Sequence, residues 1–68
     1  MQLTVTVYQD EDSCCVVECP AIPGCISQGT TEDEALANIR EAIQDCLEVR
    51  AELGLPPTLE TRLVEVAA

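Results

Sequence analysis

The side chains that could do chemistry are five cysteines and thirteen carboxylates, and the chain contains no histidine. A nucleophilic thiol or hydroxyl normally relies on an adjacent base, so mechanisms built on a nucleophile–histidine pair are excluded. Neighbouring carboxylates would also raise the pKa of a thiol and disfavour the reactive thiolate. We therefore predict that the chain is not an enzyme and uses no cofactor.

Two clusters have the residue types of a metal site but lack its spacing. The Asp-Glu-Asp run at residues 10–12 has neither the Gly turn nor the distant bidentate Glu of an EF-hand loop. Cys14, Cys15, Cys19 and Cys25 do not form two paired knuckles of a zinc site. We predict no metal, and we interpret the cysteines as small, mostly buried apolar residues in a reducing compartment.

The charge balance indicates what kind of partner the chain can approach. The formal net charge is −10, and Tyr8 is the single aromatic residue. Nucleic-acid binding depends on cations that displace counterions and on aromatic platforms for bases, so we expect no direct nucleic-acid binding by this chain alone. A basic protein is the electrostatic complement. Residues 1–4 lack a signal-peptide pattern and no apolar run could span a bilayer, so we expect a cytoplasmic protein.

A row of carboxylates on the predicted helix is the main candidate binding feature. At 100° per residue these side chains fall on one narrow stripe opposite the apolar face. The stripe, called here the acidic ridge, consists of Glu34, Glu41, Asp45, Glu48 and Glu52. One interpretation is a solvated face that keeps the protein soluble. The other is a ridge that docks on an arginine- and lysine-rich surface, together with the acidic loop Asp10, Glu11 and Asp12.

The elements that would position these residues are indicated by hydrophobic periodicity. Alternation with a period of two predicts strands at residues 2–9 and 14–19. A short third strand is predicted at residues 25–28, and the β-branched character of residues 61–66 predicts a last strand. Apolar residues recur at helical spacing over residues 32–53.

Turn and capping signals support these limits. Thr31 and Glu34 have the spacing of a capping box, and Gly54 followed by Pro56 predicts the helix end. The order β-β-β-α-β predicts an α+β fold in two layers, with an antiparallel meander of three strands. The helix should cross over so that the fourth strand lies parallel to the first, with Leu3, Val5 and Val7 facing the helix.

The length of 68 residues is sufficient for one domain, residues 1–68, with a small core. A domain of this size buries only about 60% of the surface of its unfolded chain, so its stability is marginal. We therefore expect self-association into a homodimer or a higher homo-oligomer.

Residues 18–43 resemble the HicB antitoxin family. The similarity lies in the Pro-x-Ile-Pro-Gly-Cys turn, the Ser-x-Gly-x-Thr segment before the helix and the Glu-Ala-x-x-Asn-Ile-x-Glu-Ala-Ile helix. The motif positions that we expect to be structural are Pro23, Gly24, Ser27, Gly29, Thr31 and Asn38. The resemblance implies a partial RNase H-like fold. It also implies a partner, a small basic HicA-type toxin that cleaves mRNA and whose RNA-facing surface the antitoxin covers.

Two other functions stay open at this point. The chain could be an orphan, homo-oligomeric HicB-like adaptor that binds another protein or a small ligand. An RNase H-type nuclease is the third possibility, but such a site needs a carboxylate in the middle of the first strand, where Thr4, Val5 and Thr6 stand. We expect no nuclease activity.

Overall fold

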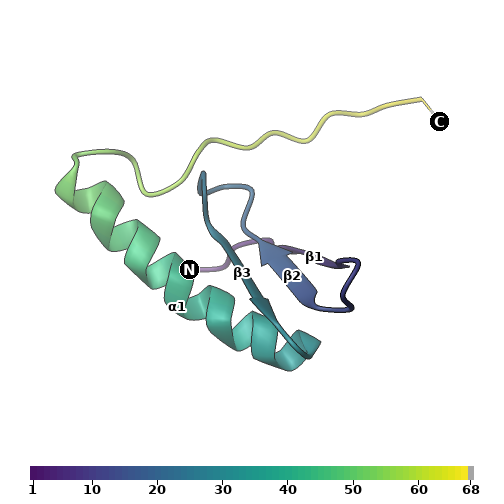
Figure 1. Ribbon diagram of the computed structural model, residues 1–68. Helices are drawn as coiled ribbons and strands as arrows, with labels where there is room; N and C mark the ends of the chain where they lie inside the picture. The colour runs from purple at the N-terminus through teal and green to yellow at the C-terminus, as the bar shows by residue number, and fades with distance from the viewer. Residues whose placement is uncertain (68) are drawn as a thin grey trace.

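Three short strands form one antiparallel sheet in the order β1-β2-β3 (Figure 1). The computed structural model describes residues 1–67. Strand β1 spans Thr6–Gln9, β2 spans Cys15–Glu18 and β3 spans Ile26–Gly29. Val17 lies on the central strand and is completely buried. The predicted antiparallel meander is confirmed, with each strand close to its expected place and the first strand four residues shorter at its start.

Helix α1 spans Glu32–Glu52 and begins with the predicted cap. The Thr31 hydroxyl accepts a hydrogen bond of 3.1 Å from the Glu34 backbone N–H. The Glu34 carboxylate in turn accepts hydrogen bonds from Thr30, at 3.1 Å from its hydroxyl and 3.4 Å from its backbone N–H. The Glu34 N–H, which the first helical turn would leave without a partner, is thereby satisfied, while the Glu34 carboxylate bonds to Thr30 in place of the Thr31 N–H of a capping box.

The helix ends in a Schellman motif at Gly54. This glycine has a φ of 72°, a conformation that a residue with a Cβ adopts at a cost. Its N–H donates to the carbonyl of Ala51 at 3.1 Å, and the N–H of Leu55 donates to the carbonyl of Arg50 at 2.8 Å. The predicted helix end is confirmed.

The core lies between α1 and one face of β2 and β3, as the two layers in Figure 1 show. It contains Cys15, Val17, Cys19, Ile22, Cys25, Ala35 and Ile39. The three core cysteines have no disulfide partner, so they act as small apolar residues as predicted. Ile22, in the turn between β2 and β3, is among the largest fully buried side chains.

Strand β1 lies at the sheet edge that α1 does not cover. Leu3 and Val5 pack against the core from the segment before β1, as predicted. Val7, expected in the same core, is 42% exposed instead. The physical reason is the position of the helix: α1 packs on β3 and β2, and β1 lies beyond them.

The predicted strand at residues 61–66 is not a strand in the structure, so a fourth strand parallel to the first is not shown. After the helix, the N–H of Leu59 donates to the carbonyl of Ala21 at 2.7 Å. Beyond that bond the chain is extended and runs past the sheet (Figure 1). A β-branched sequence favours extended backbone, but a strand also requires a hydrogen-bonded neighbour.

Candidate partner-binding surface

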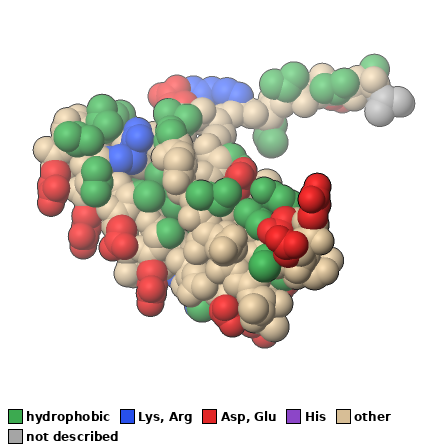
Figure 2. Space-filling model, viewed as in Figure 1, with side chains coloured by type: hydrophobic (Ala, Val, Ile, Leu, Met, Phe, Trp, Pro, Cys, Tyr) green, Lys and Arg blue, Asp and Glu red, His purple; other side chains and the backbone are tan. Residues whose placement is uncertain are grey.

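The acidic ridge lies on the outer side of α1, and all five of its carboxylate residues are exposed. Figure 2 shows acidic side chains following the helix along its outer edge. The two buried helix residues, Ala35 and Ile39, face the sheet. The ridge therefore points away from the core because the apolar stripe is buried on the opposite side of the helix.

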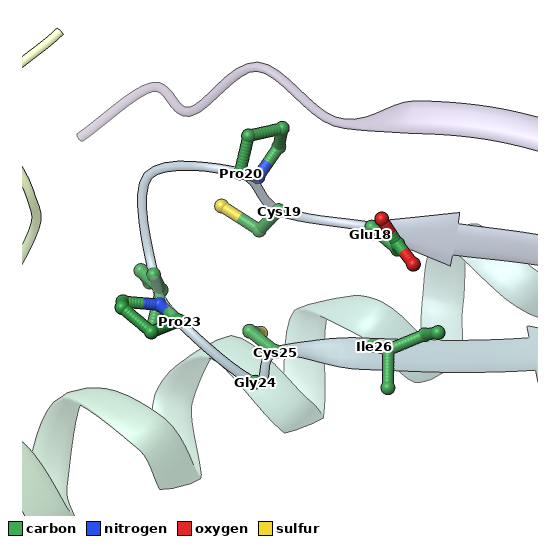
Figure 3. A pocket seen from close by; sticks show the side chains of 8 residues that line it. Glu18, Cys19, Pro20, Pro23, Gly24, Cys25 and Ile26 are labelled. Atoms are coloured by element: carbon green, nitrogen blue, oxygen red, sulfur yellow. The ribbon is translucent and has the colours of Figure 1, made fainter.

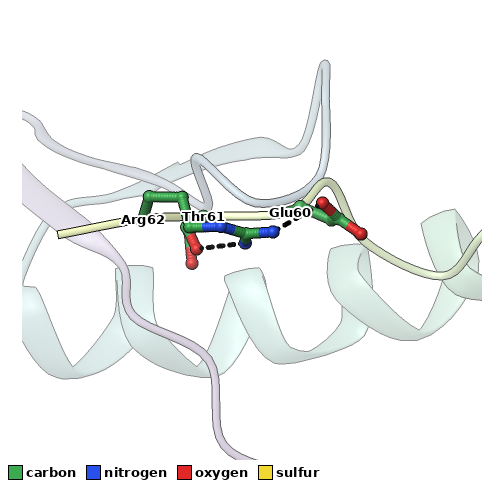
Figure 4. A network of polar contacts seen from close by, with 3 residues as sticks. All are labelled: Glu60, Thr61 and Arg62. Atoms are coloured by element: carbon green, nitrogen blue, oxygen red, sulfur yellow. Dashed lines mark hydrogen bonds and ion pairs between the residues drawn. The ribbon is translucent and has the colours of Figure 1, made fainter.

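Few cations are available to neutralise the ridge. Within residues 1–67 the one ion pair joins Arg62 and Glu60 at 2.8 Å, and Arg62 also donates to the carbonyl of Thr61 (Figure 4). Arg50 donates through Nε to the carbonyl of Pro56 at 2.6 Å, on the apolar side of the helix. The described part of the chain thus gives no ridge carboxylate a cationic partner.

Glu34 differs from the other members of the ridge. Its carboxylate is engaged by Thr30 and its backbone by the Thr31 cap, so its presence is explained by helix initiation. The remaining ridge residues make no side-chain hydrogen bond within residues 1–67; they are Glu41, Asp45, Glu48 and Glu52. Within the ridge, these four carboxylates therefore have no structural partner in the described residues.

The acidic loop between β1 and β2 is also exposed, but Figure 1 places this end of the hairpin away from α1. One Oδ atom of Asp10 accepts hydrogen bonds from the N–H groups of Asp12, at 2.9 Å, and Cys14, at 3.0 Å. Ser13 has a φ of 64°, in the left-handed region that such tight loops use. Asp10 therefore shapes the turn, while Glu11 and Asp12 have side chains free of such contacts in the described residues.

Two of the motif positions, Asn38 and Gly29, lie where the helix packs on the sheet. The side-chain amide of Asn38 donates to the carbonyl of Gln28 at 2.8 Å. Gly29 is buried, and a Cβ placed there would lie 2.6 Å from the backbone N of Ala35. Gly24 has a φ of 77° in the turn before β3. Asn38 and Gly29 thus lie where α1 meets β3, and Gly24 lies in a turn that needs a positive φ.

A hollow of about 250 Å³ lies in the turn between β2 and β3, as Figure 3 shows. Its lining includes Glu18, Cys19, Pro20, Pro23, Gly24, Cys25 and Ile26. Burial raises the pKa of the Cys25 thiol to about 11, and a hydrogen bond with Cys46 adds to the effect. A thiol held in its protonated form is a poor nucleophile. The hollow is therefore a small cavity whose Cys25 thiol is not an activated nucleophile.

Among residues 1–67, no three or more Cys, Asp or Glu side chains are grouped so that they could hold a metal ion. None of the described helical residues make up a segment sufficiently long and apolar to cross a membrane.

Sequence reasoning did not anticipate two exposed apolar regions. One is the extended segment of residues 60–67, where Leu63, Val64 and Val66 are exposed. The other is a groove near the helix end, lined by residues that include Val49, Leu53 and Leu55. The β-branched character of residues 61–66 predicts a paired strand, and the sequence carries no signal that its neighbour is missing.

The fold and this surface define a small, acidic α+β module with an exposed, charged helix. The sequence of residues 3–68 matches the family model described as HicB_like antitoxin of bacterial toxin-antitoxin system. The chain belongs to this HicB-like antitoxin family. Membership supports an antitoxin role in general and favours a non-catalytic protein.

Three relatives carry the name UPF0150 protein. The one from Thermoplasma acidophilum is 52% identical over 48 residues, which cover 71% of this chain and 70% of the relative. The one from Archaeoglobus fulgidus is 33% identical over 97% of this chain and 96% of its own length. The one from Synechocystis is 45% identical over 82% of this chain and 77% of its own length. No solved structure matches the chain.

Proposed function

We propose that this chain is an antitoxin that binds a small basic HicA-type toxin and covers the toxin's RNA-facing surface. A toxin that cleaves mRNA must attract phosphates, so its RNA-facing surface should be rich in Arg and Lys. An acidic protein can occupy such a surface by presenting carboxylates in place of phosphates. HicB-like family membership supports a toxin partner, and the HicA type is part of the proposal.

The observation that carries the proposal is the set of four exposed ridge carboxylates without a cationic partner in the described residues. Asp45 follows Glu41 by four residues and precedes Glu48 by three, so the ridge places like charges side by side. Each such pair costs roughly 0.2–0.5 kcal/mol on a helix surface. A cationic partner surface would turn this repulsion into attraction on binding.

The proposal includes the other properties expected of such a protein. The chain would act as a single HicB-like domain in the cytoplasm, with a partial RNase H-like fold and without direct contact to nucleic acid. It would also self-associate, because a chain of 68 residues has a small core.

Binding can be tested with a purified HicA-type toxin as the probe, taken from a neighbouring open reading frame where the native host encodes a short basic protein there. Asp45→Lys combined with Glu48→Lys should weaken binding by at least about tenfold at low salt. The same variant should reduce the salt dependence of the affinity, because fewer screened charge pairs remain. Co-expression of the unchanged chain should relieve the growth arrest caused by the probe, and the variant should relieve it less.

A matched control separates the ridge from net charge. Glu32→Lys combined with Glu65→Lys also reverses two carboxylates, so both variants change the net charge from −10 by +4, to about −6. The control should bind nearly as well as the unchanged chain. Equal weakening by both variants would show that only overall charge matters. The absence of any binding between the unchanged chain and the probe would reject the antitoxin proposal.

A further inference from the structure

The outer edge of β1 is open and unusually unprotected. Strand β1 pairs on one side with β2 and has no partner on its other side in the described residues. Residues 1–9 contain no Asp, Glu, Lys or Arg. Val7 and Tyr8 are 42% and 50% exposed. Edge strands of soluble proteins usually carry charges, prolines or bulges that prevent pairing with another chain, and this edge carries none of the charges.

A second unpaired element is the extended segment of residues 60–67, called here the tail. Leu63, Val64 and Val66 are exposed, and Leu63 is as open as a free side chain. Beyond Leu59, the described residues of the tail make no backbone hydrogen bond with the rest of the chain. Figure 1 shows the tail running past the sheet and away from the helix. The tail therefore has the sequence and conformation of a strand without a neighbour.

The exposed area of the chain is too large for a closed monomer. The chain exposes 5398 Å², whereas a folded protein of 7.3 kDa should expose about 4,200 Å². Its radius of gyration is 13.6 Å, against about 11 Å for a compact chain of this length. The excess area of about 1,200 Å² exceeds the roughly 800 Å² that each partner buries in a standard interface.

The charge distribution indicates where a second copy could make contact. Two copies with a net charge of −10 each repel one another over most of their surfaces. Residues 1–9 carry no charged side chain, and the tail carries Glu60, Arg62 and Glu65, of which Glu60 and Arg62 form an ion pair. The β1 edge and the tail are therefore the two elements that can meet between copies with the least repulsion.

We infer that the tail of each copy adds as a strand to the open β1 edge of a second copy. The inference rests on the self-association included in the proposed function and names its surface, but it does not need the toxin. The tail starts beside the segment that leads into this edge: the lining of a groove of about 450 Å³ includes Leu3 and Thr4, just before β1, and Arg62 and Leu63 of the tail. Exchange of the two tails would bury their apolar side chains and leave the acidic ridges free.

Proline substitutions test the backbone pairing in the full chain. Successive N–H groups of a strand point to opposite sides, so one of two adjacent prolines must remove a hydrogen bond from the exchanged strand. The dimerisation affinity of Leu63→Pro and of Val64→Pro is therefore measured by sedimentation equilibrium. Val64→Thr is the matched control. At least one proline variant should weaken dimerisation by about tenfold or more, and the threonine variant should stay close to the unchanged chain.

A mixed-label NMR experiment decides which copy supplies the strand. Isotope-labelled and unlabelled chains are mixed, and filtered spectra then detect contacts between copies only. Contacts between the Val64 or Val66 methyl groups of one copy and Val7 or Tyr8 of another are expected. A monomer at all concentrations, a dimer that both prolines leave intact, or tail contacts to β1 within one copy only would overturn the inference. The ridge variant Asp45→Lys with Glu48→Lys should still dimerise. Failure of toxin binding can therefore be distinguished from failure of dimerisation.

Discussion

The side-chain amide of Asn38 donates a hydrogen bond of 2.8 Å to the backbone carbonyl of Gln28. This bond joins the second turn of α1 to β3, through two residues that are ten positions apart in the sequence. It helps to hold the helix on the sheet in the orientation that leaves the acidic ridge on the outer side.

Asn38→Ala should lower the free energy of unfolding by about 1 kcal/mol, since the Gln28 carbonyl loses its side-chain donor. Asn38→Asp should cost more, because it places a carboxylate oxygen against a carbonyl oxygen. Urea unfolding at neutral pH measures both. Equal stability of the unchanged chain and both variants would contradict the role assigned to Asn38.

Gly29→Ala should destabilise the fold by about 1–3 kcal/mol, because its Cβ would lie 2.6 Å from the Ala35 backbone N and one backbone must move. Gly24→Ala is the matched comparison. That site has open space but a φ of 77°, so the expected cost is only that of backbone strain, about 1 kcal/mol. Thermal unfolding followed by circular dichroism would contradict this prediction if Gly24→Ala were the more damaging change.

The raised pKa of the Cys25 thiol leads us to expect that the protein loses stability in alkali. Burial is the main cause that raises this pKa from 9.0 to about 11. A hydrogen bond with Cys46 and the nearby Cys46 and Cys19 thiols also contribute to the raised pKa. The folded state thus holds this proton more tightly than the unfolded state. The stabilisation is complete below the unfolded pKa, and between pH 9.0 and about 11 stability should fall by up to about 1.4 kcal/mol per pH unit.

Urea unfolding across this pH range measures the slope, with Cys25→Ala as the comparison. The variant starts from a lower stability because it leaves a small void in the core. Its stability should nevertheless fall less steeply between pH 9.0 and about 11. An identical slope in the two proteins would show that the Cys25 thiol is not the responsible group.

Asp45→Asn should stabilise the isolated protein by about 0.5–1 kcal/mol at low salt, because it removes repulsion from Glu41 and Glu48. The gain should shrink as added salt screens these charges. Glu32→Gln is the opposing control: Glu32 lies in the first helical turn, where a negative charge interacts favourably with the helix dipole, so its loss should cost about 0.3–1 kcal/mol. Thermal unfolding at two salt concentrations checks both signs.

The helix and its ends could be predicted from the sequence because their determinants are local. The cap at Thr31 and the Schellman motif at Gly54 depend on residues within one or two turns, and the apolar period defines which side is buried. The position of the acidic ridge follows from the same period. The alternation of β2 and the short turns likewise predicted the meander.

The tertiary structure decided what depends on contacts between distant residues. Ile22 is a core residue because the turn folds under the helix, and Val7 is exposed because α1 covers β2 and β3 but not β1. Residues 61–66 have the composition of a strand and remain unpaired, since composition favours an extended backbone without supplying its partner. The sequence by itself determined the local elements and the face that carries charge. Only long-range packing decided which edge and which apolar side chains stay open.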